Sequence, residues 1–296
     1  MSDNIHYDIT DIVPPPHSGR YTVDASPHRH TIDPKRPPMS ATVLAILLVG
    51  SLAAGWVDAV VGGGGLILIP LVMILNPGFT SAQALGANKV AAIFGTVTSA
   101  FTLARRVPSI TTALRFAPLA IAGSAAGALV ASSVDKQIMR PIIIALLIGV
   151  GVFVAVRPQF GRSGGARRSP TTRTWLATIA LVGAIAVYDG TFGPGTGLFL
   201  IMGFTTLLGG DFIANAAWAK VINVCTNLGA LATFAVQGDV PWLLGLALAV
   251  TNVVGARIGA RMVLGRGAGF VRAVIFVVVV AMAAKLAFDQ FAGPIG

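Results

Sequence analysis

Long apolar segments separated by short polar or glycine-rich connections make up most of the chain from residue 42 onward. Two of these segments have only about ten residues, whereas a straight helical span of a bilayer needs about 20. Each short segment directly follows a cluster of glycines, which predicts a helix that is broken inside the membrane. The predicted segments are 42–61, 66–75, 84–104, 113–131 and 138–156, followed by 175–187, 198–208, 212–236, 242–264 and 270–288.

The same order of segments occurs twice, and four residues of special chemistry recur with it. The first set is Asp58, Gly62, Gly64 and Lys89, and the second set, 131 positions later, is Asp189, Gly193, Gly195 and Lys220. A fixed offset kept over more than thirty positions indicates an internal repeat. We therefore predict an all-α polytopic membrane protein built from two repeats of about five segments, with eight to ten membrane segments in total.

The pattern divides the chain into four parts. Residues 1–41 contain many prolines and histidines, and we expect a disordered tail there. Residues 42–156 form the first transmembrane repeat, and residues 175–290 form the second. Residues 157–174, which link them, carry five arginines and no acidic residue, so we expect this linker to face the cytoplasm.

The number of crossings depends on the two short segments. If both cross the bilayer, each repeat crosses five times and the repeats are inverted, with the arginine-rich connections on one side. If both are re-entrant, there are eight crossings, and Arg261 and Arg266 fall on the opposite side from the linker. We favour the inverted repeats, because they satisfy the positive-inside rule.

Composition agrees with a protein that is solvated mainly by lipid. Hydrophobic residues make up 55% of the 296 residues, charged residues make up 11%, and the mean hydropathy is +0.81. A soluble globular protein is about 25% charged. We therefore expect a multi-pass protein of the plasma membrane, which is the inner membrane in a bacterium. The net charge of +10 comes from arginines in short connections, so we do not expect nucleic-acid binding.

The residue types available in the apolar part also limit the chemistry. The chain has no glutamate and one cysteine, Cys225, and its four histidines all lie within the first thirty residues. Metalloenzymes and intramembrane hydrolases need His, Glu or Cys at ligand or nucleophile spacing. We therefore expect no metal site, no cofactor and no enzymatic activity.

Charged residues inside lipid-facing segments are costly, by about 2.5–3.5 kcal/mol each, and mark either a pathway or a buried ion pair. Here they form two matched sets, Asp58 with Lys89 and Asp189 with Lys220. Two interpretations stay open. Each aspartate could pair with a lysine and fix the packing of the helices. Alternatively, the lysines face an anionic substrate while Asp58 or Asp189 exchanges a coupling ion, either a proton or sodium.

The glycine clusters favour the second interpretation. A broken helix exposes backbone N–H groups and the positive end of a helix dipole, and both attract an anion. Lys220, Asn223 and Asn227 also share one helix face by their spacing. The predicted substrate-binding residues are Gly62, Gly63, Gly64, Gly65, Asn88, Lys89, Gly193, Gly195, Thr196, Gly197, Lys220, Asn223 and Asn227.

Small residues late in each repeat predict close helix packing. Gly123 and Gly127 are four residues apart, and so are Gly255 and Gly259. This spacing places both glycines of a pair on one helix face, where another helix can approach closely.

Two motifs resemble the signatures of a known family. The first runs from Gly55 through Asp58 to Gly65 and continues at 85–89 with Leu-Gly-Ala-Asn-Lys. The second runs from Tyr188 to Gly197 and continues at 219–223 and 226–230. Together they resemble the TauE/SafE family of sulfite and organosulfonate exporters over about residues 42–290. The resemblance implies a polytopic plasma-membrane transporter of anions that bear sulfur–oxygen groups.

These observations lead to one hypothesis with two alternatives. We expect a secondary transporter that exports a small sulfur-containing oxyanion, with the substrate, the coupling ion and the lipid bilayer as its partners. The alternatives are an anion channel and an importer of a related anion. The chain carries no nucleotide-binding motif, so any direct use of ATP would require another chain.

Overall fold

The structure is built from helices, and no strand occurs among the residues it describes. This computed structural model describes residues 39–107, 110–134, 137–139, 141–143, 145–146, 149 and 171–291. The predicted all-α class is therefore confirmed. The predicted tail up to residue 38, most of the predicted linker and most of the segment predicted at 138–156 lie outside the described residues.

The first repeat begins with a broken pair of helices, as predicted. Ser40 caps the first helix by accepting the N–H of Val43, and Gly62 ends it in a left-handed conformation. Thr80 and Gln83 form a reciprocal capping box at the start of the third helix. The helices of this repeat are α1 (Ala41–Val61), α2 (Gly65–Leu75), α3 (Ser81–Ala104), α4 (Ile110–Ala113), the 3-10 helix η2 (Leu114–Phe116) and α5 (Ala117–Ser133).

The second repeat has the same sequence of a long, a short and a long helix. Its helices are α7 (Thr172–Thr191), α8 (Thr196–Leu208), α9 (Phe212–Val236) and α10 (Trp242–Phe291). Two predicted boundaries are corrected. Thr171 caps α7, so residues 172–174 of the predicted linker are helical, and α1 starts one residue inside the predicted tail.

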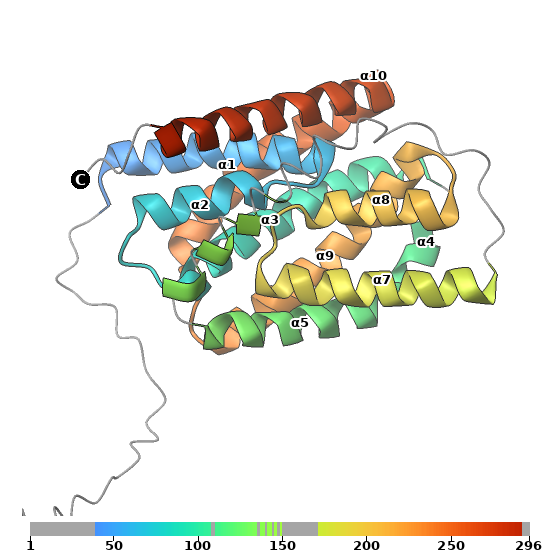
Figure 1. Cartoon of the computed structure of the whole chain (residues 1–296), viewed down its shortest axis with the longest axis horizontal. Helices are drawn as coiled ribbons and strands as arrows, with labels where there is room; N and C mark the ends of the chain where they lie inside the picture. Colours follow the sequence, from blue (N-terminus) through green and yellow to red (C-terminus); the bar gives the residue numbers. More distant parts are fainter. Residues whose placement is uncertain are drawn as a thin grey trace, which may run out of the picture. The chain divides into compact units, whose positions relative to one another are not determined.

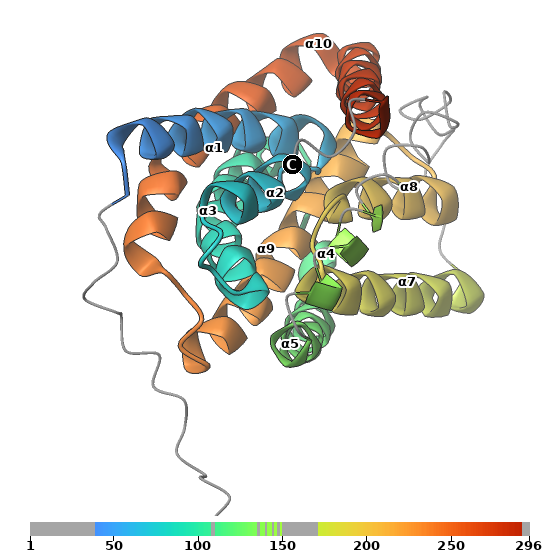
Figure 2. The ribbon, with the colours of Figure 1, turned by 60° about the vertical axis from the view of Figure 1, so that its left-hand side comes forward.

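The last helix also differs from the prediction. We predicted separate segments at 242–264 and 270–288, but α10 is one helix of 50 residues. Gly265, Gly267 and Gly269 lie between the two predicted segments. Each costs about 1 kcal/mol relative to alanine but keeps its N–H, so the backbone ladder continues through them. A straight helix of this length would reach about 75 Å, and Figure 2 shows that α10 bends, with its late part (red) seen nearly end-on.

Helix α5 of the first repeat and helix α10 of the second each pack against the other repeat. Helices α1 and α3 pack against α10, whereas α7 and α9 pack against α5 (Figure 1). Predicted glycine pairs lie at these contacts. A Cβ atom at Gly255 would lie 2.0 Å from the carbonyl oxygen of Leu52 in α1, and one at Gly127 would lie 2.1 Å from the carbonyl oxygen of Val187 in α7. The predicted close packing is therefore confirmed.

Among the residues that the structure describes, five helices are long and apolar enough to cross a membrane: α1, α4 through α5, α7, α9 and α10 up to Arg266. Helix α3 is as long but falls outside this group, because Asn88 and Lys89 lower its hydropathy. Helices α2 and α8 are apolar but have only 11 and 13 residues. The surface is apolar where a soluble protein would be polar: Leu243 is 89% exposed, whereas Lys89 is 1% exposed. The protein is therefore a multi-pass membrane protein.

Candidate functional site

The two helix breaks meet in the interior of the fold. Gly62 follows α1, and Gly193 occupies the corresponding place after α7, with φ angles of 87° and 88°. The N–H of Gly197, in the first turn of α8, donates to the carbonyl oxygen of Gly62 at 3.1 Å. A Cβ atom at Gly62 would lie 2.5 Å from the Cα atom of Gly197, so the contact requires glycine.

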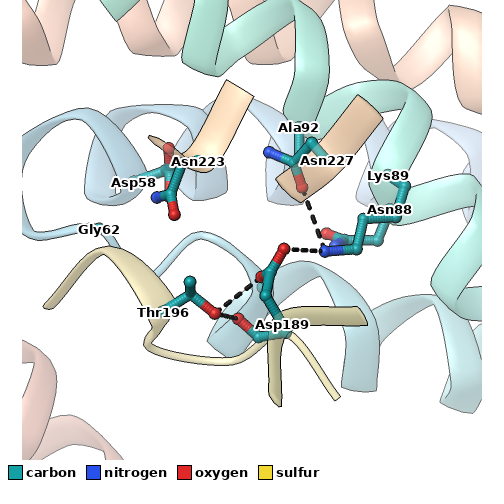
Figure 3. A pocket seen from close by; sticks show the side chains of 11 residues that line it. Asp58, Gly62, Asn88, Lys89, Ala92, Asp189, Thr196, Asn223 and Asn227 are labelled. Carbon is teal, nitrogen blue, oxygen red and sulfur yellow. Dashed lines mark hydrogen bonds and ion pairs between the residues drawn. The ribbon is translucent and has the colours of Figure 1, made fainter. Parts of the chain in front are cut away.

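Two buried ion pairs connect the repeats. Lys89 Nζ donates to Asp189 Oδ2 at 2.6 Å, and Lys220 Nζ donates to Asp58 Oδ2 at 2.8 Å. Each aspartate therefore pairs with a lysine, but the partners are exchanged between the repeats relative to the two sets matched by sequence. Figure 3 shows Lys89 reaching Asp189 across the space below α9.

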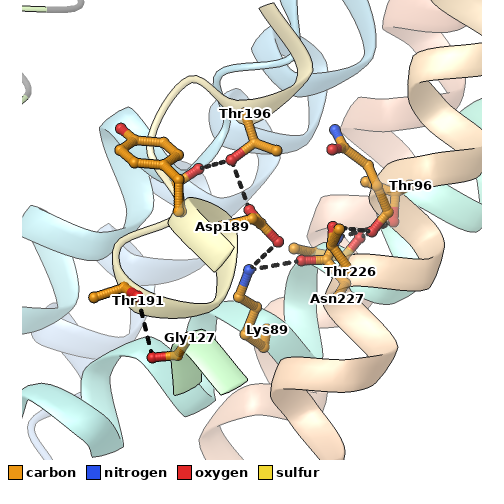
Figure 4. Close-up of polar contacts among 12 residues, drawn as sticks. Lys89, Thr96, Gly127, Asp189, Thr191, Thr196, Thr226 and Asn227 are labelled. Atoms are coloured by element: carbon orange, nitrogen blue, oxygen red, sulfur yellow. Dashed lines mark hydrogen bonds and ion pairs between the residues drawn. The ribbon is translucent and has the colours of Figure 1, made fainter. Parts of the chain in front are cut away.

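Asp189 lies in a continuous chain of hydrogen bonds. Thr196 Oγ1 donates to Asp189 Oδ1 at 2.7 Å and also lies 2.8 Å from the carbonyl oxygen of Gly193. On the other side, Lys89 Nζ also donates to Asn227 Oδ1 at 3.2 Å, and Asn227 Nδ2 donates to Thr96 Oγ1 at 3.3 Å (Figure 4). The hydroxyl of Thr196, the carboxylate and the ammonium thus act as one connected group.

Asp58 has a different environment. Its Oδ1 accepts the N–H of Gly64 at 3.3 Å, and Lys220 Nζ also donates to its backbone carbonyl oxygen. The position that corresponds to Thr196 in the first repeat is Gly65, which has no hydroxyl. The Asp58 side chain is 16% exposed, against 6% for Asp189, so Asp58 is the more accessible of the two.

A small polar cavity lies between the two breaks and the ion pairs (Figure 3). Its volume of about 20 Å³ is enough for a single water molecule. The lining residues are Asp58, Gly62, Gly65, Asn88, Lys89, Ala92, Asp189, Gly193, Thr196, Asn223 and Asn227. All of them except Ala92 belong to the site residues predicted from the sequence.

Five of the predicted substrate-binding residues do not line this cavity: Gly63, Gly64, Gly195, Gly197 and Lys220. The glycines shape the two breaks, and the Lys220 ammonium is held against Asp58. Ala92 was not predicted, because alanine carries no polar signal, although it corresponds to Asn223 in the repeat.

Two amide side chains of the cavity are available to a ligand. Asn223 is 4% exposed, and its Oδ1 has no hydrogen-bond partner. Asn88, also buried, makes no side-chain hydrogen bond to the described residues. Because buried polar groups in native proteins are nearly always hydrogen-bonded, the Oδ1 atom of Asn223 calls for a hydrogen-bond donor, such as water, in the cavity.

Tyr188 supports the second break from outside the cavity. Its hydroxyl donates to the carbonyl oxygen of Pro194 at 2.6 Å, and its ring packs edge-on against Phe199. Its position directly before Asp189 was the only signal for this role in the sequence.

Comparison with known proteins agrees with these features. Residues 46–286 match the family described as "Sulfite exporter TauE/SafE". The chain belongs to this family. The resemblance drawn from the two motifs is therefore confirmed, and this TauE/SafE protein is a membrane transporter. No solved structure matches the chain.

Relatives of this TauE/SafE protein are bacterial and are matched over most of their length. The chain is similar to "Probable membrane transporter protein ORF9" of Sinorhizobium sp., with 34% identity over 83% of this chain and 93% of that protein. It is also similar to "Probable membrane transporter protein YfcA" of Escherichia coli strain K12, with 33% identity over 85% of this chain and 92% of that protein. A "Probable membrane transporter protein" of Haemophilus influenzae is 33% identical over 84% of this chain and 96% of that protein.

Proposed function

We propose that this protein is a secondary transporter that exports a small sulfur-containing oxyanion, either sulfite or an organosulfonate. The observation that carries the proposal is the Lys89 ammonium at a polar cavity inside otherwise apolar helices. Asn88, Asn223 and Asn227 lie around it and supply amide groups for an oxyanion. Charged groups buried in membrane proteins are costly and mark either a buried pair or a substrate pathway, and Lys89 lines the cavity in addition to pairing with Asp189.

The two short helices add to the attraction for an anion. Helices α2 and α8 both begin at the cavity, where Gly65 and Thr196 line it. The first N–H groups of a helix have no partner within the helix, and this end carries a partial positive charge. Broken helices that point such ends at anionic groups are a recurring device of secondary transporters.

The size of the cavity supports a carrier over a channel. A sulfite ion has four heavy atoms, which do not fit in a space for one water molecule. Substrate must therefore separate groups that now touch, and the two ion pairs are the groups that close the space. A site that must open around its substrate is expected for alternating access, whereas a channel needs a continuous open path.

Counterflow of radiolabelled sulfite into proteoliposomes tests the proposal. We expect saturable exchange that unlabelled sulfite or methanesulfonate inhibits and that chloride and phosphate do not. Lys89→Gln should strongly weaken this exchange, whereas Arg257→Gln should retain it, because Arg257 is an exposed cation of α10 outside the site. Exchange that does not saturate would favour the channel. No exchange of sulfite or methanesulfonate by folded wild-type protein would contradict the proposal.

The direction of transport needs a separate measurement. The family description and the motifs support export. Cells that lack the protein should accumulate sulfite when it is produced internally, and the full chain should lower the internal concentration. An unchanged or raised internal concentration would favour the importer instead.

A further inference from the structure

The charges at the cavity are balanced before any substrate binds. Lys89 and Lys220 carry two positive charges, and Asp58 and Asp189 carry two negative charges, paired at 2.6 and 2.8 Å. An incoming anion would leave this buried cluster with a net negative charge, which is costly inside a membrane protein. One proton taken up for each negative charge of the substrate restores the balance.

The geometry points to Asp189, and not Asp58, as the carboxylate that takes up this proton, with Thr196 as the positioning residue that allows it. This inference rests on the proposed function. Thr196 has one hydroxyl proton but lies near two acceptors, 2.7 Å from Asp189 Oδ1 and 2.8 Å from the Gly193 carbonyl oxygen. While Asp189 is ionised, the hydroxyl donates to the carboxylate.

The same three groups satisfy the protonated carboxyl without any movement of the backbone. The O–H of Asp189 then donates to Thr196 Oγ1, and Thr196 turns its own proton to the Gly193 carbonyl oxygen. A hydroxyl can both donate and accept, so the bond between the two side chains is kept in either protonation state.

Asp58 has no hydroxyl partner of this kind among the residues that the structure describes. Its two carboxylate oxygens accept from Lys220 Nζ and from the backbone N–H of Gly64, and both of these groups are donors only. Protonation of Asp58 would place its O–H against a donor. Gly65, which corresponds to Thr196 in the repeat, supplies no side chain that could accept it.

The charged and titratable groups around Asp189 agree with this assignment. Among the described residues, α3 brings Lys89 and α1 brings Asp58 across the cavity, while α9 brings Lys220, which is already paired with Asp58. Helices α5 and α8 bring no charged residue. The hydroxyl of Tyr188, next to Asp189 in α7, donates a hydrogen bond to the carbonyl oxygen of Pro194.

Proton and anion then move together. A proton from the aqueous phase binds Asp189 and neutralises it, which releases the Lys89 ammonium from the carboxylate. Lys89 keeps its contact with Asn227 and pairs with the oxyanion in the cavity. When the anion leaves, Asp189 returns the proton to water and pairs with Lys89 again.

Accumulation of radiolabelled sulfite driven by a pH gradient tests this inference with the full chain in proteoliposomes. Protein-free vesicles measure the sulfite that crosses as a neutral acid, and this part is subtracted. For one coupled proton, wild-type protein should concentrate sulfite on the alkaline side about tenfold per pH unit. Any sulfite exchange that Asp189→Asn retains should no longer concentrate sulfite. Asp58→Asn should reach the wild-type ratio, even if slowly, because the final ratio does not depend on the rate.

A set of threonine variants keeps the test valid if Asp189→Asn does not fold. Thr196→Val removes the hydroxyl and should lower the accumulation ratio toward one, whereas Thr196→Ser should preserve the ratio. Thr205→Val in the same helix is the control, because its hydroxyl bonds Ile201 and Asn215 away from the cavity.

Each contrary result has a distinct meaning. A wild-type ratio in Asp189→Asn, or loss of the ratio in Asp58→Asn alone, would overturn the assignment of the proton to Asp189. Sulfite exchange by the wild type without any response to pH would overturn the coupling but not the proposed function. Failure of the wild type to exchange sulfite at all would overturn the proposed function and this inference with it.

Discussion

Asn227 donates a hydrogen bond of 3.3 Å to Thr96, the residue 131 positions earlier, which is its own counterpart in the internal repeat. Two corresponding residues can touch only where the two repeats meet. Asn227 also contacts Lys89, so this meeting point adjoins the cavity. The candidate site therefore lies between the repeats and belongs to neither of them alone.

Removal of one member of a buried ion pair should destabilise the protein more than removal of both members. Lys89→Gln leaves Asp189 buried without its cation, and breaking such a pair typically costs about 3–5 kcal/mol. We expect a clear fall in the apparent melting temperature of the purified protein, measured by tryptophan fluorescence in detergent. Lys89→Gln combined with Asp189→Asn should recover most of that fall without recovering transport. Equal melting temperatures for wild type and Lys89→Gln would contradict the prediction.

The two lysines should differ in what they contribute to transport. Lys89 lines the cavity, whereas Lys220 is held at Asp58 and does not line it. Lys89→Gln should therefore raise the half-saturating sulfite concentration by at least about tenfold, or about 1.4 kcal/mol of binding free energy, where residual transport is measurable. Lys220→Gln should mainly lower the maximal rate. A similar rise in the half-saturating concentration for both variants would argue against this division of roles.

The meeting of the two helix breaks should depend on Gly62. An alanine there adopts a left-handed conformation, which costs about 1–2 kcal/mol, and its Cβ atom also meets the backbone of Gly197. Gly238 is a matched control, because its φ of 79° is similar but nothing lies within 4 Å of a Cβ atom. We expect Gly62→Ala to abolish sulfite exchange and Gly238→Ala to retain it. Comparable activity of the two variants would show that the close contact is dispensable.

The packing of α5 on α7 should depend on Gly190 in the same way. A Cβ atom at Gly190 would lie 1.9 Å from the carbonyl oxygen of Ser124, whereas at Gly183 the nearest atom, in Leu119, would be 3.6 Å away. Gly190→Ala should lower the apparent melting temperature by several degrees. Gly183→Ala, in the same helix, should leave it unchanged or raise it slightly, since alanine is the better helix former. The reverse order would contradict the described helix contact.

The residues that line the cavity could be predicted from the sequence, but the pairing of the charged residues could not. Aspartate, lysine and clustered glycine are conspicuous in apolar segments, and the repeat presents each signal twice, so nearly all lining residues could be named in advance. The exchange of ion-pair partners between the repeats could not be predicted, because Asp58 lies at the same spacing from Lys89 as Asp189 does from Lys220. Pairing within a repeat and pairing between repeats look alike in one dimension.

Two other features show where sequence patterns mislead. Thr196 corresponds to Gly65 in the first repeat, and this difference can be seen in the sequence. Only the fold reveals that the Thr196 hydroxyl reaches both Asp189 and Gly193. The glycines near residue 267 indicate a break by composition, yet glycine retains its N–H and α10 continues. The inverted relation of the repeats and the number of crossings stay predictions.

The crossed ion pairs can form only after both of their members have been synthesised. Lys89 is synthesised 100 residues before Asp189, and Asp58 is synthesised 162 residues before Lys220. At usual translation rates each charge therefore waits roughly 5 to 30 seconds for its partner. The first half of the nascent chain cannot complete its interior while the ribosome is still making the second, so the two halves must mature together.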